Sequence, residues 1–394
     1  MKVLYYGNVV NYAFSFAITL RTAGHKDIYA LIEDDDLYTP DFLTEDNSQN
    51  LPFIYLEKEG RVIEDLRGRK YDSCAFMSGF DIVHCFSATT AIYCYELRVP
   101  YIYHNVGCFS DLYRWYDPRR SWFGLASIKD WVFTWKFRNM VRSSKAVIGS
   151  LGCDLTEMED FISLSDKRNY AFPIPYFAFS LSLEKDKVDL EKFDAKTLQV
   201  FSTSATESGR TIILMPARHN WPLKGQPLMF DALVEISRSY ESVTIVCVEW
   251  GPHVQRSKDY IHSVGLSDQV IWIPRLTSSE LQRCLVRSSC CLIEFRQGIS
   301  GGYGGCALDA LLAGCPAVTQ ACPIDAIRVF RSPAPIFDAT CEVSSIVNSL
   351  EAALRVPSSS RAAYAAESNN WLDVECGVQL LSHYTNIYEE VVSG

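Results

Sequence analysis

Residues 290–318 read CCLIEFRQGISGGYGGCALDALLAGCPAV, and this stretch decides the fold. Its apolar start predicts a strand, the segment near 303–313 predicts a helix, and the run PAVTQ that follows predicts a second strand. Several glycines stand at the turn between the first strand and the helix, so backbone amides at the helix start can approach a phosphate without side chains in the way. We therefore expect a diphosphate to be bound at this turn, by Gly301, Gly302, Tyr303, Gly304 and Gly305.

The same alternation extends through the second half of the chain. The runs VTIVCVE and VIWIP predict further strands, and the segments 226–239, 254–264 and 278–288 predict helices between them. Short apolar strands that alternate with helices indicate a parallel sheet covered on both faces. Residues 210–374 are therefore expected to form a Rossmann-like domain that binds a nucleotide.

The first half shows a similar pattern. VLYYG predicts a strand, Tyr12 to Ala23 an amphipathic helix, and further strands are expected at 27–32, 53–56, 82–85, 100–103 and 146–148. Residues 1–180 are predicted to form a first α/β domain, and the polar stretch 181–209 to form a linker. The last run, VQLLSHYTNIYEEVV, has apolar residues at helical spacing, which predicts a C-terminal helix over about 375–394.

Composition excludes several classes of protein. A chain of 394 residues suits two domains, and 48% hydrophobic with 21% charged residues exclude disorder as the main state. The net charge of −10 argues against nucleic acid as a partner. The fourteen cysteines contain no CxxC pair, and neither a signal peptide nor an 18-residue apolar run is present. We expect a cytoplasmic protein, soluble or peripheral on the cytoplasmic membrane face.

A second element, PARHNWPLKG, follows the strand that begins at Thr211. Its cations Arg218 and Lys224 would lie where open α/β sheets bind ligands, and together they could neutralise a departing diphosphate. Asp309 lies seven residues beyond Gly302, on the same helix face, where it could accept hydrogen bonds from ribose hydroxyls. Each of these residues alone has a commoner structural explanation, and their co-occurrence favours function.

In the first half, His104 ends the strand PYIY and is expected to point into the crevice, whereas His84 lies within a strand and is interpreted as structural. Asn8 and Asn105 are candidate polar contacts, with loop capping as an equal alternative. Paired acids in the run Glu33 to Asp36 could hold a metal on a diphosphate. We favour a solvated loop there and expect neither a metal nor a cofactor.

On these motifs the chain resembles the retaining, nucleotide-sugar-dependent glycosyltransferases of family 4. The resemblance covers nearly the whole chain, and it implies the α/β GT-B fold, in which two Rossmann-like domains face each other across a cleft and the C-terminal helix returns to the N-terminal domain. It implies that Arg218 and Lys224 bind phosphate, that Gly7 is the glycine of the first loop, that His104 lies near the transferred sugar and that Asp309 grips the ribose.

The sequence departs from the family's Glu-(seven residues)-Glu motif at its first acid, which falls on Gly301. In the family this Glu contacts hydroxyls of the donor sugar. Either the donor sugar is held by other groups, with Glu294 and Arg296 as the candidates, or this member uses an unusual sugar.

The resemblance implies transfer of a sugar from a nucleotide-diphosphate sugar to a hydroxyl acceptor, such as a lipid-linked or polysaccharide intermediate. Two alternatives stay open. A GT-B sugar-nucleotide epimerase or phosphorylase would use the same phosphate site, and a catalytically silent protein would bind the nucleotide sugar without turnover.

Residues 113–145 contain eight Lys or Arg against two Asp, with four tryptophans, a local charge of +6 in an acidic protein. Basic residues interleaved with aromatic ones suit the headgroup region of an anionic membrane. A packed helix with solvated cations is an equal alternative.

Overall fold

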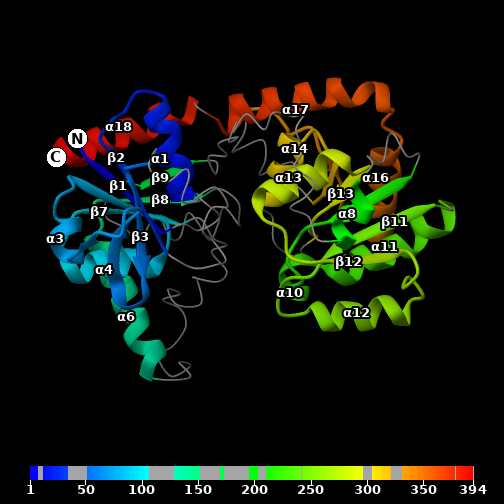
Figure 1. Ribbon diagram of the computed structural model, residues 1–394, viewed down its shortest axis with the longest axis horizontal. Helices are drawn as coiled ribbons and strands as arrows, with labels where there is room; N and C mark the ends of the chain where they lie inside the picture. Colours follow the sequence, from blue (N-terminus) through cyan, green and yellow to red (C-terminus); the bar gives the residue numbers. More distant parts are fainter. Residues whose placement is uncertain are drawn as a thin grey trace. The chain divides into compact units, whose positions relative to one another are not determined.

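The computed structural model describes residues 1–7, 12–33, 51–105, 128–150, 169–172, 195–202, 210–240, 242–295, 304–320, 331–377 and 379–393. The chain divides into two compact units, each with its own β-sheet (Figure 1). Unit 1 comprises Met1–Phe177 and Cys376–Gly394, and unit 2 comprises Ala178–Glu375. The last segment of the chain therefore returns to the first unit.

The sheet of unit 1 has its strands in the order β5-β4-β3-β2-β1-β6-β7-β8-β9. Its strands are β1 (Val3–Tyr6), β2 (Ile28–Glu33), β3 (Ile54–Lys58), β4 (Val62–Asp65), β5 (Lys70–Tyr71), β6 (Ile82–Cys85), β7 (Tyr101–Asn105), β8 (Ala146–Ser150) and β9 (Asn169–Phe172). All neighbours are parallel except β3–β4 and β4–β5, which are antiparallel. The order reverses direction between β1 and β6, which is typical of Rossmann-like sheets.

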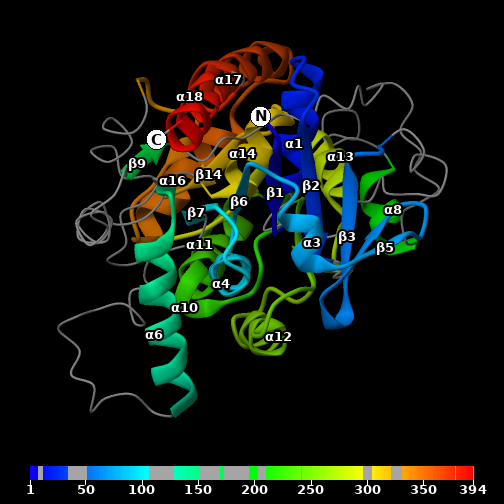
Figure 2. The ribbon, with the colours of Figure 1, turned by 90° about the vertical axis from the view of Figure 1, so that its left-hand side faces the viewer.

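The helices of unit 1 are α1 (Tyr12–Thr22), α3 (Ser73–Met77), α4 (Ala88–Leu97), α6 (Ile128–Ser143) and α18 (Gln379–Ser393), with a 3-10 turn η2 (Glu59–Arg61). Helix α4 begins at a capping box, in which Ser87 and Thr90 satisfy each other's backbone amides. The C-cap of α4, Arg98, adopts a left-handed conformation and ends the helix before β7. Figure 2 shows β7, β6, β1, β2 and β3 of this unit side by side, with α6 extending beyond them.

Unit 2 has a fully parallel sheet in the order β12-β11-β10-β13-β14-β15. In chain order this is 3-2-1-4-5-6, the order of dinucleotide-binding Rossmann folds. The strands are β10 (Thr211–Met215), β11 (Val243–Val248), β12 (Val270–Ile273), β13 (Cys290–Leu292), β14 (Ala317–Thr319) and β15 (Phe337–Asp338).

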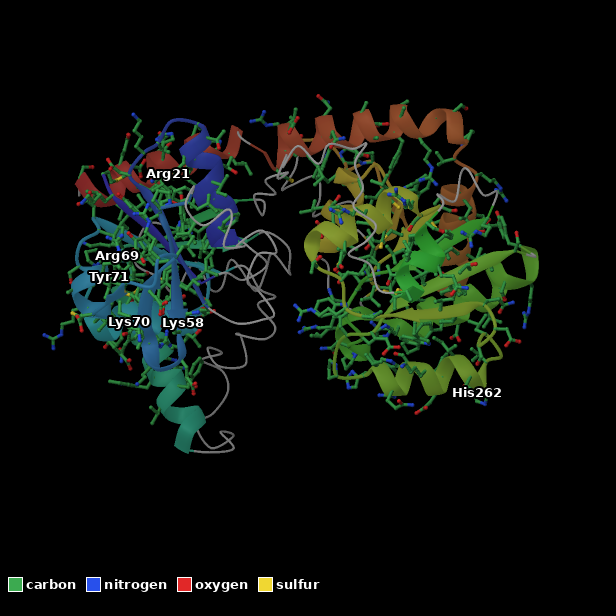
Figure 3. All side chains as sticks on the ribbon, in the orientation of Figure 1. Arg21, Lys58, Arg69, Lys70, Tyr71 and His262 are labelled. Atoms are coloured by element: carbon green, nitrogen blue, oxygen red, sulfur yellow. The ribbon has the colours of Figure 1, made fainter. Side chains whose placement is uncertain are left out.

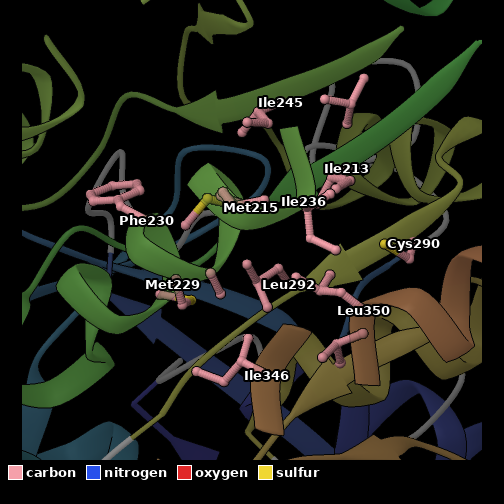
Figure 4. Close-up of a cluster of buried hydrophobic side chains, with 14 of the residues drawn as sticks. Ile213, Met215, Met229, Phe230, Ile236, Ile245, Cys290, Leu292, Ile346 and Leu350 are labelled. Atoms are coloured by element: carbon pink, nitrogen blue, oxygen red, sulfur yellow. The ribbon is translucent and has the colours of Figure 1, made fainter. Parts of the chain in front are cut away.

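The helices of unit 2 are α8 (Ala195–Phe201), α10 (Trp221–Lys224), α11 (Gln226–Ser239), α12 (Val254–Ser263), α13 (Ser278–Arg287), α14 (Gly305–Leu312), α16 (Val343–Leu354) and α17 (Arg361–Glu375), with a 3-10 turn η5 (Ser358–Ser360). Strands of this sheet are almost continuously apolar because both faces are covered. Figure 4 shows how α11 and α16 bury Ile236, Ile346 and Leu350 against β10 and β13. Each such side chain contributes roughly 1.5–3 kcal/mol by leaving water.

The predicted α/β fold with two parallel sheets is confirmed, as is the return of the C-terminal helix to unit 1. Two features differ from the sequence prediction. The hairpin β4–β5 extends the sheet of unit 1, and the predicted linker 181–209, which lies mostly outside the described residues, contains helix α8. No helix within the described ranges is both long and apolar enough to cross a bilayer.

Candidate functional site

The strand order of unit 2 sets the position of its candidate site. β10 is hydrogen-bonded to β13, and these two neighbours are the first and fourth strands of the unit, so the chain leaves them in opposite directions. Open α/β sheets bind ligands outside the carboxyl ends of strands at such a switch point. Arg218 follows the end of β10, and Glu294 lies two residues beyond the end of β13. The two candidate segments therefore leave adjacent strands at the same edge.

Gly225 lets these two segments pack closely against each other. Gly225, which follows Lys224, has a φ of 66° and ends the short helix α10. A Cβ at this position would lie 1.9 Å from the Phe295 carbonyl oxygen, so only glycine fits. The Phe295 amide donates a hydrogen bond to the Lys224 carbonyl oxygen, at 3.2 Å. The backbone of the Lys-Gly element is therefore fixed against the segment that carries Glu294.

Glu294 lies between the cation and the glycine turn. Its Oε2 pairs with the Lys224 ammonium, and both side chains are largely buried, at 12% and 20% exposure respectively. A Cβ on Gly304 would come within 2.7 Å of Glu294 Oε1, so the carboxylate lies directly against the backbone at the N-cap of α14. Gly304 has an ordinary φ of −65°, so it is needed here for space and not for its conformational freedom.

Cys306, in the first turn of α14, lies within the electrostatic reach of three of these groups. Burial raises the pKa of its thiol to about 12, with further raising by the Asp309 and Glu294 carboxylates and an opposing effect of Lys224. The thiol is therefore protonated near neutral pH. Its surroundings show that Lys224, Glu294 and Asp309 gather around the start of one helix.

Asp309 is partly exposed on α14, one turn beyond Cys306. Its Oδ1 accepts a hydrogen bond from Gln282 Nε2 at 3.1 Å, and the same amide nitrogen donates to the Asp309 carbonyl oxygen at 3.2 Å. Gln282 belongs to α13, so this contact holds two helices together. The predicted contact of Asp309 with a ribose stays a prediction.

Arg218 is exposed, and its backbone is held in place. Its carbonyl oxygen accepts a hydrogen bond from Gln226 Nε2 at 3.0 Å. A Cβ on Gly251, which has a φ of 108°, would lie only 3.0 Å from the Arg218 Cγ. Within the described ranges no carboxylate pairs with its guanidinium. The next residue, His219, is buried and bonds to Ser257 Oγ at 2.9 Å, which fixes the loop.

These groups can bind an anion. An ammonium, the positive end of a helix and an exposed guanidinium lie on segments that leave adjacent strand ends. Neither Gly225 nor Gln282 was singled out by sequence analysis. The glycine was visible only as the end of the Lys-Gly pair, and the glutamine carries no pattern that distinguishes it from other surface amides.

In unit 1, Gly7 lies at the end of β1, beside the point where the strand order reverses. Its φ is 87°, and a Cβ there would lie 3.0 Å from Thr90 Cγ2, in the first turn of α4. Glycine therefore lets the backbone at the end of β1 approach the N-terminus of α4 closely. Its predicted role in donor binding stays a prediction.

His104 is part of a buried polar chain. Its Nδ1 lies 3.0 Å from His84 Nε2, and His84 Nδ1 lies 2.6 Å from the Tyr388 hydroxyl, which in turn bonds to the Tyr5 hydroxyl at 2.8 Å. All four side chains are fully buried. Sequence analysis missed both tyrosines, because helical spacing places Tyr388 on the buried face of α18 and says nothing about the partner of its hydroxyl.

The expectation that the His104 side chain points into a crevice is therefore not met in this structure, since its ring is enclosed by Phe86, His84 and Tyr384. Burial lowers the pKa of His104 to about 3, and burial together with the neighbouring His104 lowers that of His84. Both rings are neutral near neutral pH. Because His84 and His104 belong to one buried network, their geometry gives no reason to call one functional and the other structural.

Several candidates lie outside the described residues, namely Asn8, Arg296, Gly301, Gly302, Tyr303 and the acids 34–36. Asn105 is described as the last residue of β7, by its backbone alone. Glu33 ends β2. Over the described residues, no group of three or more His, Cys, Asp or Glu side chains is placed to hold a metal ion.

Helix α6 includes the described part of the basic and aromatic stretch. Phe137, Met140 and Val141 are buried in the core of unit 1, as the packed-helix alternative expects. Val132 and Trp135, at 37% and 49% exposure, lie on the other side of the helix. Exposed Arg142 lies seven residues after Trp135, on that same face. Exposed cations also occur at the opposite edge of the sheet, where Figure 3 labels Arg69 and Lys70.

A mostly parallel sheet in unit 1 and a fully parallel sheet in unit 2 define an α/β protein with two Rossmann-like units. Solved structures with this arrangement include the sucrose-phosphate synthase of Thermosynechococcus elongatus (TM-score 0.63, 12% identity, 100% of both chains). Others are the Anabaena protein HepE in complex with UDP-glucose (0.59, 14%, 100% of this chain and 98% of that one) and the UDP-forming α,α-trehalose-phosphate synthase of Burkholderia xenovorans (0.59, 12%, 100% of both).

One family of sequences matches part of the chain. Residues 199–372 match the family of glycosyl transferases group 1, and this range covers most of unit 2. This part of unit 2 is thus similar to group 1 glycosyl transferases, and the chain shares its fold with the solved GT-B structures. No curated protein is similar enough in sequence to count as a match.

Proposed function

We propose that the protein is a retaining, metal-independent glycosyltransferase that moves a sugar from a nucleoside-diphosphate donor to a hydroxyl acceptor. The observation that carries the proposal is the convergence of Lys224, Glu294 and the start of α14 at the switch point of a group 1 domain. A diphosphate needs positive groups that are fixed before it arrives, and these elements supply an ammonium and a helix N-terminus.

In the proposed reaction, negative charge develops on the diphosphate as the bond to the sugar breaks. Lys224 and Arg218 would stabilise this charge, and the amides at Gly304 and Gly305 would bind a phosphate oxygen. The acceptor hydroxyl would attack on the face from which the diphosphate leaves, and a donor phosphate oxygen would take its proton. No protein nucleophile is needed. His104, whose ring is enclosed within unit 1, has no part in this proposal.

The first test is turnover with a panel of nucleotide sugars. UDP-glucose heads the panel because HepE, which has the same fold, forms a complex with it. Lys224→Ala and Arg218→Ala should each lower kcat by at least about a hundredfold, the size expected for losing one charge-stabilising group. Lys258→Ala is the matched control, since Lys258 pairs with Glu249 at a partly exposed position. Near-normal turnover in both site variants would exclude the mechanism.

Product analysis separates the alternatives. An epimerase would produce isomers of the nucleotide sugar without an acceptor, and a phosphorylase would produce a sugar phosphate. A silent binding protein would take up nucleotide sugar and turn over none of the panel. A glycoside formed only when a hydroxyl acceptor is present supports the transferase.

A lipid-linked acceptor would bring the protein to a membrane, and we propose the exposed face of α6 as the contact. Trp135 can insert at the headgroup level while Arg142 binds anionic lipid. The double variant Trp135→Ala/Arg142→Glu should lose sedimentation with phosphatidylglycerol vesicles. Val286→Ala/Arg287→Glu on α13 is the matched control, since Val286 is 57% exposed. Equal binding of both double variants would remove this contact.

A further inference from the structure

Lys224 already has an anionic partner in this structure. The Glu294 carboxylate pairs with its ammonium through Oε2, and Oε1 faces the backbone at Gly304, where α14 begins. One carboxylate thus contacts two of the positive groups that a diphosphate would need. Both side chains are mostly buried, so water screens this contact less than it would at the surface.

We propose that Glu294 competes with the donor diphosphate for Lys224 and the start of α14, and that the displaced carboxylate then selects a neutral sugar. The inference rests on the proposed function of this site. Glu294 is already a candidate for binding the donor sugar. This inference adds that Glu294 lowers the affinity for the diphosphate and favours neutral sugars.

Electrostatics gives the direction of both effects. An anion that enters this site meets the negative charge of Glu294 at close range, and part of its attraction to Lys224 is offset. A mostly buried carboxylate that has lost its ammonium partner is stabilised by new hydrogen-bond donors, because losing a buried partner is costly. Hydroxyls of the attached sugar can donate to it. A uronic acid would instead place a second carboxylate beside it, so the site should favour neutral sugars.

The competition is tested by the dissociation constants of UDP, GDP and ADP. Glu294→Gln removes the charge and keeps the shape of the side chain. Whichever of the three nucleotides binds to wild type should therefore have a dissociation constant about tenfold lower in the variant, which equals about 1.4 kcal/mol. Glu249→Gln is the matched control. Glu249 follows the end of β11, pairs with Lys258 at 2.9 Å, and should leave the affinity unchanged when it is neutralised. Unchanged or weaker binding by Glu294→Gln would overturn the proposal.

Thermal melting shows whether Glu294→Gln is folded, and Glu294→Ala provides a second test of the same charge. For selectivity, wild type should bind UDP-glucose more tightly than UDP-glucuronic acid, and Glu294→Gln should reduce that ratio several-fold. An unchanged ratio contradicts the sugar-selecting role.

The two proposals can fail separately. If no nucleotide binds to wild type, or if Lys224→Ala binds as tightly as wild type, the proposed function is wrong and this inference is wrong with it. If Lys224→Ala loses affinity and Glu294→Gln does not gain it, the diphosphate site stands and only the competition is excluded.

Discussion

Gly225 has no functional group, yet it determines where Lys224 and Glu294 lie. Ala at this position would combine an unfavourable φ of 66° with a Cβ 1.9 Å from the Phe295 carbonyl oxygen. We expect Gly225→Ala to lower the free energy of unfolding by roughly 3 kcal/mol. Gly265→Ala is the control, because Gly265 has a φ of 75° and nothing within 4 Å of its Cβ position. It should cost only about 1 kcal/mol. Equal losses in thermal or urea unfolding would contradict a steric role for Gly225.

Sequence analysis singled out Lys224 and Glu294 as candidates but did not predict that they pair. Lys224 and Glu294 were both candidates, but they are 70 positions apart in the chain. Their contact depends on β10 lying beside β13, and no pattern within a single strand or helix shows which strands are neighbours. The same holds for His104. Its place at a strand end was predictable, but its enclosure depends on a helix almost 300 residues later in the chain.

At the scale of elements, helix α18 contributes the Tyr388 hydroxyl to the buried polar chain of unit 1. Tyr388→Phe would remove the bond to His84 Nδ1 at 2.6 Å and leave a buried ring nitrogen without that partner. We expect a loss of about 1–3 kcal/mol in unfolding free energy. Tyr384→Phe removes a buried hydroxyl from the same helix and outside this chain of contacts, so it should cost less. Chemical or thermal unfolding of Tyr388→Phe and Tyr384→Phe shows whether the first variant loses more unfolding free energy than the second.

The same network predicts acid sensitivity. The pKa of His104 is about 3 in the folded protein because its ring is buried, whereas an unfolded chain binds a proton near pH 6.5. Stability is therefore intact above pH 6.5 and falls as the pH drops from there towards 3. At pH 5 the loss is about 2 kcal/mol for this ring. In NMR spectra the ring resonances of His104 should stay fixed between pH 7 and 5. A His104 titration in that range would contradict its burial.

Elements with strong periodicity were predictable, and those held by local charges were not. The apolar runs of β6, β10 and β11 indicate buried parallel strands. The hairpin β4–β5 was missed because its sequence, RVIEDLRGRKYD, is mostly polar. Its turn is held instead by the Asp65 carboxylate, which accepts hydrogen bonds from the Arg67 and Arg69 amides at 3.0 Å. Such a turn depends on geometry that hydrophobic patterns do not carry.

For the whole molecule, the division into two units predicts two unfolding transitions. Each unit has its own sheet and its own buried core, and the groups that we propose to bind the diphosphate lie in unit 2. UDP, or whichever nucleotide binds, should raise the midpoint of one transition only. At a hundredfold excess over its Kd it stabilises the folded unit by about 2.7 kcal/mol, which raises the midpoint by about 5–11 °C for a unit of this size.

Two of the variants identify the transitions in calorimetry. Gly225→Ala should lower the midpoint of the transition that the nucleotide raises, and Tyr388→Phe should lower the other one, because Gly225 lies in unit 2 and Tyr388 in unit 1. Lys224→Ala should keep both transitions and lose the shift with nucleotide. If nucleotide raised the transition that Tyr388→Phe lowers, the diphosphate would be bound by unit 1, and the assignment of the donor site to the start of α14 would be wrong.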